Sequence, residues 1–220
     1  MEFQIDDYLT ADGSDPYWDW NQSLDPMTRA KVHGRVFRLS QGNFQNCKPI
    51  AAAHVKGVRE LTIDLGPGYR VHFGRDGEKL VLLLTGGIKK SQRRDVAKAL
   101  AYWKDYKARK GKRQMALTRS YKELVLNDIK NDPAFAAALF QEAVTAVFNG
   151  ELSFALTTLR DIVNAGMGFQ ALSRAVGMTA QNLHRVLCEK GNPTVKTLGK
   201  IITAIGEHGG FEKPVFAIAS

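Results

Sequence analysis

The chain of 220 residues has little cysteine and no metal-binding spacing. Its two cysteines, Cys47 and Cys188, lie far apart and lack a CxxC or Cys/His pattern, which argues against a disulfide framework and a zinc site. No apolar run approaches the roughly 18–20 residues that a membrane-spanning helix needs. The first 25 residues contain no lysine or arginine, whereas a secretory leader begins with basic residues. We therefore expect a reduced, cytoplasmic protein without metal, cofactor or membrane contact.

Positive charge is concentrated in the first half of the chain. The net charge is +9, yet residues 1–25 carry seven acidic and no basic side chains. Residues 26–114 carry 21 Lys and Arg against six Asp and Glu, and residues 115–220 carry ten against nine. A basic block favours polyanions because each phosphate contact releases condensed counterions. The alternative is a solvated surface that only keeps the protein soluble.

The hydrophobic period also differs between the halves. Short runs of alternating or continuous apolar residues, joined by tight turns, predict three antiparallel strands in 58–65, 69–73 and 79–85. A short strand is expected at 3–9, and helices are expected from Pro26 and from Gln92. After the basic stretch KARKGKRQ the pattern is helical. The fold class expected is therefore two domains, an α+β domain with an antiparallel sheet and an all-α domain. The expected bounds are 1–106, a basic linker 107–116, and 117–220.

Residues 169–188 have the spacing of a helix-turn-helix. Leu172 and Val176 on the first helix and Leu183 on the second face a core, and Gly177 supplies a left-handed turn. A recognition helix would then present its outer N-terminal side chains to the major groove. The candidate DNA-binding residues are Thr179, Ala180, Gln181, Asn182 and Arg185. The alternative is a plain helical hairpin with polar residues facing solvent.

The second half resembles a known family. MALTRSYKELVL from Met115, LRDIVNA at 159–165, the helix-turn-helix spacing and the GNP of 191–193 are similar to HigA-like addiction-module antitoxins. The resemblance covers residues 115–207, and Met115 falls where such antitoxins begin. It implies that this half binds operator DNA as a homodimer, represses its own operon and neutralises a partner toxin, within the chain or between chains.

The first half also resembles a known family. YLTADGSDPYWDW at 8–20, GVRELTIDLGPGYRVHF at 57–73 and LLLTGGIKKSQ at 82–92 are similar to the HigB branch of the RelE toxin superfamily, over about residues 4–107. The resemblance implies a metal-independent α+β endoribonuclease that cuts mRNA, commonly on the ribosome. The whole chain then resembles a toxin fused to its antitoxin.

Cleavage of RNA by its own 2′-OH requires proton transfer and positive charge against an extra-negative phosphorane. The candidate catalytic residues are Arg70, His72, Lys89 and Lys90, and the candidate RNA-binding residues are Lys48, Arg59, Gln92 and Arg93. Each has a structural alternative; Arg70, for example, can equally pair with Glu60 or Asp64 on the neighbouring strand.

Three positions depart from the toxin pattern. Thr62 stands where the pattern has Arg, Ile88 where it has Asp, and His72 where it usually has Tyr. His72 offers an acid or base near neutral pH in compensation. The alternative to an inhibited ribonuclease is a DNA-binding regulator whose toxin-like half is catalytically degenerate and serves in dimerisation or nucleic-acid contact.

Overall fold

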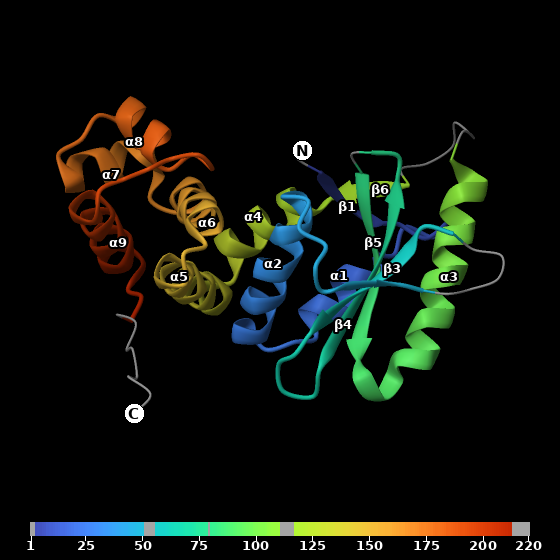
Figure 1. The fold of residues 1–220 in the computed structure, drawn as a ribbon. Coiled ribbons are helices and arrows are strands. Elements are labelled where there is room, and N and C mark those ends of the chain that lie inside the picture. Colours follow the sequence, from blue (N-terminus) through green and yellow to red (C-terminus); the bar gives the residue numbers. More distant parts are fainter. Residues whose placement is uncertain (1–2, 51–55, 79, 111–116, 213–220) are drawn as a thin grey trace. The chain divides into compact units, whose positions relative to one another are not determined.

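The computed structural model describes residues 3–50, 56–78, 80–110 and 117–212. The chain divides into two compact units (Figure 1). The sheet unit comprises Met1–Asp25 and Arg35–Glu123, and the helical unit comprises Pro26–Gly34 and Leu124–Ser220. The segments of each unit are therefore not continuous in sequence.

The sheet unit contains six strands in the order β2-β3-β4-β5-β1-β6. The strands are β1 (Gln4–Tyr8), β2 (Cys47–Pro49), β3 (Val58–Ile63), β4 (Tyr69–Asp76), β5 (Leu80–Ile88) and β6 (Thr118–Ser120). The predicted meander of β3, β4 and β5 is confirmed, and the neighbouring strands are antiparallel. The antiparallel sheet that was expected is mixed as a whole, because β1 pairs with β5 in parallel. Alternation predicts a strand but not the direction of its partner.

Helices cover both faces of this sheet. Helix α3 (Gln92–Arg109), which follows the 3₁₀ turn η1 (Lys89–Ser91), lies along one face, and α1 (Pro16–Gln22) lies on the other (Figure 1). Trp103 of α3 packs directly on Gly74, where an added Cβ would lie 2.1 Å from its ring. The core beneath α3 consists of Tyr8, Val58, Leu82, Leu84, Ala99, Trp103 and Tyr106.

Strand β6 comes from beyond the predicted linker and was not expected from the sequence. It pairs antiparallel with β1, which places Arg119 opposite Asp7. Arg119 Nη2 also donates to the carboxylate of Asp15 over 2.8 Å, while Asp15 caps α1 by accepting from the backbone N–H of Trp18. Burial raises the pKa of Asp7 well above its ordinary value, and the neighbouring carboxylate of Asp15 adds to the shift. The sheet unit is thus completed by residues that follow the linker.

Helix α2 (Pro26–Ser40) is shared between the units. Its residues Pro26–Gly34 belong to the helical unit, and its later residues belong to the sheet unit. The remaining helices of the helical unit are α4 (Tyr121–Asn131), whose first three residues belong to the sheet unit, α5 (Pro133–Phe148), α6 (Leu152–Ala165), α7 (Gly168–Val176), α8 (Ala180–Val186) and α9 (Val195–Gly209). Asp132 begins α5 by accepting from the N–H of Phe135, with Pro133 in the first turn.

Arg29 joins α2 to the later helices of this unit through ion pairs. Its side chain is 5% exposed and forms ion pairs with Asp128 and, at 2.8 Å, with Asp132. Its guanidinium also lies 4.3 Å from the ring centre of Phe135. A segment from the first half of the chain is therefore built into the helical unit.

The expected domain bounds stay a prediction, and two features of the structure lie close to them. The expected linker began at residue 107, but α3 continues to Arg109, and residues 111–116 lie outside the described part. In the structure, residues 26–34 are grouped with the later helices, and residues 117–123 are grouped with the sheet. Among the described residues, no helix is long and apolar enough to cross a membrane.

Candidate nucleic-acid-binding site

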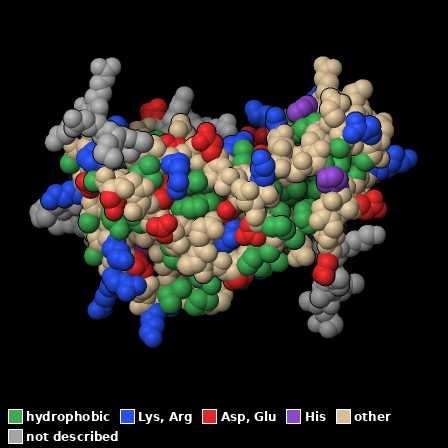
Figure 2. All heavy atoms as spheres, turned by 180° about the vertical axis from the view of Figure 1, so that it is seen from behind, with side chains coloured by type: hydrophobic (Ala, Val, Ile, Leu, Met, Phe, Trp, Pro, Cys, Tyr) green, Lys and Arg blue, Asp and Glu red, His purple; other side chains and the backbone are tan. Residues whose placement is uncertain are grey.

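Exposed cations gather where β5 ends and α3 begins. Lys89, Lys90, Arg93 and Arg94 are all exposed and line one open pocket of about 710 Å³ together with Ile88, Ser91 and Gln92. We call these four side chains the basic cluster. Figure 2 shows a group of Lys and Arg side chains at its lower left, the side on which the start of α3 lies after the half-turn from Figure 1. Such a cluster suits a chain of phosphates.

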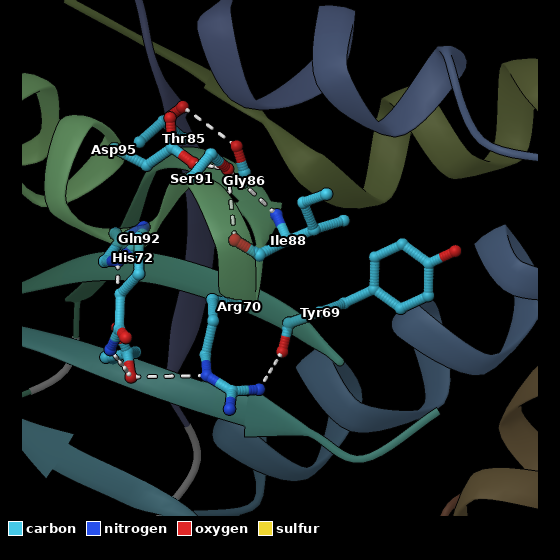
Figure 3. Close-up of polar contacts among 10 residues, drawn as sticks. Tyr69, Arg70, His72, Thr85, Gly86, Ile88, Ser91, Gln92 and Asp95 are labelled. Carbon is cyan, nitrogen blue, oxygen red and sulfur yellow. Dashed lines mark hydrogen bonds and ion pairs between the residues drawn. The ribbon is translucent and has the colours of Figure 1, made fainter. Parts of the chain in front are cut away.

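Arg70 lies beside this cluster but is largely buried. Its residue is 9% exposed, and its Nη1 donates to the backbone carbonyl of Tyr69 over 2.8 Å (Figure 3). Gly68 separates Arg70 from Lys89: an added Cβ there would lie 3.5 Å from Arg70 Nη1 and 3.7 Å from Lys89 Cβ. Gly68 has a φ of +75°, which favours glycine. The turn thus brings one buried and one exposed cation close together.

The carboxylate of Glu60 contacts three side chains of the site. Gln92 donates to both carboxylate oxygens over 2.9 and 2.8 Å, and Arg70 Nε lies 3.5 Å from Oε1. His72 Nε2 lies 3.1 Å from Oε2 (Figure 3). The structural alternative for Arg70, an ion pair with Glu60, is therefore present. Asp64 is exposed at the end of the strand.

His72 shares a strand face with Arg70, as expected, but it is completely buried. Burial lowers its pKa below the ordinary value, against the opposing effect of Glu60. In its neutral form the ring would carry its proton on Nε2, the nitrogen that faces the carboxylate. As a candidate acid or base, His72 has no access to solvent in the structure, because α3 covers this face of the sheet. His72 is placed to position Glu60 instead.

The other predicted RNA-binding residues are not all brought together. Gln92 acts on Glu60, and Arg93 belongs to the basic cluster. Lys48 is exposed on β2, directly opposite Glu60 and so on the face of Arg70. Arg59 points to the opposite face, where its guanidinium lies 5.7 Å from the ring centre of Phe44. Arg59 therefore does not join the candidate site.

Two residues of the site were missed by sequence reasoning. Glu60 was considered only as an ion-pair partner, and Arg94 was not named. Glu60 could have been found from the strand pattern, because alternation places residues 60, 70 and 72 on one face. Thr62, the position where the toxin pattern has Arg, pairs with Arg70 on that same face.

The predicted DNA-binding residues lie at a two-helix turn of the helical unit. Gly177 ends α7 in the left-handed conformation, and Thr179 caps α8 by accepting from the N–H of Asn182. Gln181 and Arg185 are exposed, and Arg185 Nη2 donates to Asn182 Oδ1 over 2.8 Å. Ala180 stands at the start of α8, beside them. The described residues contain no group of three or more His, Cys, Asp or Glu arranged to hold a metal ion.

Comparison with known proteins gives a family for the first half. Residues 19–104 match the model of the phage-derived protein Gp49-like family (DUF891). An uncharacterized protein of Haemophilus influenzae is 37% identical over 100 residues, which is 45% of this chain and 91% of the relative. No solved structure gives a significant match. The matched residues contain Arg70, Glu60 and the whole basic cluster. Because the family model and this relative both match, the chain belongs to the Gp49-like phage-derived family, a toxin-like family related to the RelE/HigB type.

Proposed function

We propose that the sheet unit is an mRNA endoribonuclease of the toxin type, held inactive by a helical antitoxin-like unit that also binds operator DNA. The observation that carries the proposal is the basic cluster beside Arg70, within the residues that match the toxin-like family. A phosphate chain on the cluster would bring one phosphodiester to Arg70 and Lys89.

The reaction would need only the RNA, protein side chains and water. The ribose 2′-oxygen gives its proton to water and attacks the adjacent phosphorus, and the bond from phosphorus to the 5′-oxygen breaks as that oxygen takes a proton from a lysine ammonium of the site. The products are a cyclic phosphate and a free 5′-hydroxyl. Arg70, oriented by Glu60, and Lys89 would stabilise the charged phosphorane. Lys90 is the second exposed proton donor at this place.

Inhibition would follow from the exchange of segments between the units. The helical unit includes the first part of α2, and the sheet unit includes β6. A short tether keeps such partners at roughly millimolar effective concentration, so the fused chain would stay inhibited. Among the described residues, the basic cluster's pocket is lined by residues 88–94 alone. We therefore expect a short RNA to reach it in the full chain and inhibition to concern larger targets such as the ribosome.

RNA binding by the full chain tests the site. The triple variant Lys89→Ala/Lys90→Ala/Arg93→Ala should bind a single-stranded oligoribonucleotide roughly 10- to 100-fold more weakly, since it loses three phosphate contacts. The plot of log affinity against log salt should become shallower by about 2, at about 0.7 per contact. The control Lys130→Ala/Lys196→Ala/Lys200→Ala removes the same charge from exposed positions of the helical unit. Equal losses in both variants, measured by fluorescence anisotropy, would show diffuse attraction and no site.

Operator binding tests the helical unit. Gln and Arg side chains on a recognition helix read base edges, at about 1–3 kcal/mol per good bidentate contact. The variant Gln181→Ala/Arg185→Ala should therefore lose roughly 100-fold or more in affinity for the DNA upstream of its gene. An unchanged shift in an electrophoretic assay would exclude α8 as the reading helix.

A second candidate function is a regulator whose sheet unit no longer cleaves RNA. The observations that favour it are Thr62, which leaves the strand face with one cation fewer, and the complete burial of His72. Operator binding is expected for both candidate functions. An assay of RNA cleavage distinguishes them, because only the endoribonuclease would cleave RNA.

A further inference from the structure

A second pocket adjoins the basic cluster and has no role in the function proposed above. Strand β1 pairs with β5 only as far as Leu83, so the last residues of β5 meet helices α1 and α3 on that side. A pocket of about 300 Å³ lies there, at the small end of the range of ligand sites, about 300–1,000 Å³. Its lining residues are Pro16, Trp20, Thr85, Gly86, Gly87, Ile88, Ser91, Arg94, Asp95, Lys98 and Tyr102.

Two glycines of β5 allow the pocket walls to approach. An added Cβ at Gly86 would lie 1.9 Å from the indole of Trp20, and one at Gly87 would lie 2.0 Å from the carboxylate of Asp95. Any side chain at either position would displace its neighbour. Two aromatic side chains line the pocket, Trp20 from α1 and Tyr102 from α3. Both are partly exposed.

The pocket is positively charged at its rim. Arg94 and Lys98 are exposed, whereas the single lining carboxylate, Asp95, is buried and accepts a hydrogen bond from Ser91. Arg94 Nε lies 3.6 Å from Asp95, whereas Lys98 forms no ion pair with the described residues. Aromatic rings next to a cation suit a nucleotide, because a base stacks on the ring while its phosphate meets the charge.

The pocket and the basic cluster are continuous. Ile88, Ser91 and Arg94 line both of them. We propose that the pocket receives one nucleobase of the RNA strand whose phosphates lie on the basic cluster, with Tyr102 as the stacking residue and Lys98 as a phosphate contact. The proposal rests on the RNA-binding function proposed above and deepens it, because a base pocket selects which nucleotide lies at the cluster.

The test uses the full chain and a set of hexaribonucleotides that are 2′-O-methylated to prevent cleavage. One has all its bases, and each of the others lacks the base at one position of the strand. Stacking is lost when the ring or the base is removed. Tyr102→Leu, which keeps apolar packing, should weaken binding of the complete hexamer about five- to tenfold. When the missing base is the one that the pocket receives, Tyr102→Leu should not weaken binding of the abasic hexamer any further. Lys98→Ala should make the salt dependence shallower by about 0.7, and Lys104→Ala, another exposed lysine of α3, should leave it unchanged.

The outcomes separate this inference from the proposed function. If Tyr102→Leu weakens the complete and abasic hexamers equally at every position, the pocket holds no base and the inference is wrong. If the wild-type chain binds the hexamer and the binding depends on Lys89, Lys90 and Arg93, the proposed function survives that result. If the wild-type chain binds none of the hexamers, both proposals fail.

Discussion

Arg29→Ala should lower the free energy of unfolding by about 3–5 kcal/mol, the cost of breaking a buried ion pair by removing one partner. The substitution leaves the carboxylates of Asp128 and Asp132 without their shared cation, and it removes the guanidinium from above Phe135. The side chain of Asp128 is 13% exposed, so water replaces the lost partner poorly. Urea unfolding followed by circular dichroism measures the change.

Two further variants show whether the ion pairs are the cause. Lys31→Ala removes the same charge from the same helix and should change the stability by less than about 0.5 kcal/mol. Arg29→Met combined with Asp128→Asn and Asp132→Asn should recover most of the loss, since an apolar side chain can replace a buried charge network once no charge is left unpaired. A loss that persists in the triple variant would instead be a packing effect of α2.

Glu60→Ala should cost about 2–4 kcal/mol of stability, because it leaves the buried Arg70 without its counter-charge and the side chains of Gln92 and His72 without their acceptor. It should also weaken RNA binding, since Arg70 is no longer held beside Lys89. Asp64→Ala is the matched control: it removes an exposed carboxylate from the end of the same sheet segment, and we expect a change below about 0.5 kcal/mol.

Glu60 and Asp64 were the two possible ion-pair partners of Arg70 in the sequence. Comparing the two variants therefore shows which carboxylate holds the Arg70 side chain. If Asp64→Ala is as costly as Glu60→Ala, the hydrogen-bond network described around Glu60 is not the one that holds Arg70.

Local patterns predicted much of the sheet unit. Alternation in 58–65 and 69–73 gave two neighbouring strands and the shared face of Arg70 and His72, and the apolar run after residue 79 gave the central strand. These predictions succeeded because each depends on side chains a few residues apart. The position of Lys89 and Lys90 followed from the end of that central strand.

Features that depend on distant segments were not predicted. Strand β6 has only three residues and no apolar alternation of its own; it exists because β1 offers an unpaired edge. The parallel pairing of β1 with β5 is likewise a long-range contact. The burial of His72 could not be read from the strand pattern, which assigns a face but not the helix that covers it. The same holds for Glu60, whose partners come from β4 and α3.

The central claim is that the segment before the linker, which carries Arg70 and the basic cluster, cleaves RNA once it is freed from the segment that follows the linker. The most direct test replaces residues 111–114 with a specific protease site and follows cleavage of ribosome-bound mRNA, before and after the chain is cut and diluted to nanomolar concentration. Cutting removes the tether and so its roughly millimolar effective concentration. We expect no cleavage by the uncut chain, cleavage by the cut chain, and none by the cut chain carrying Arg70→Ala. Cleavage that is equal before and after cutting, or absent after the two segments have separated, would contradict the account.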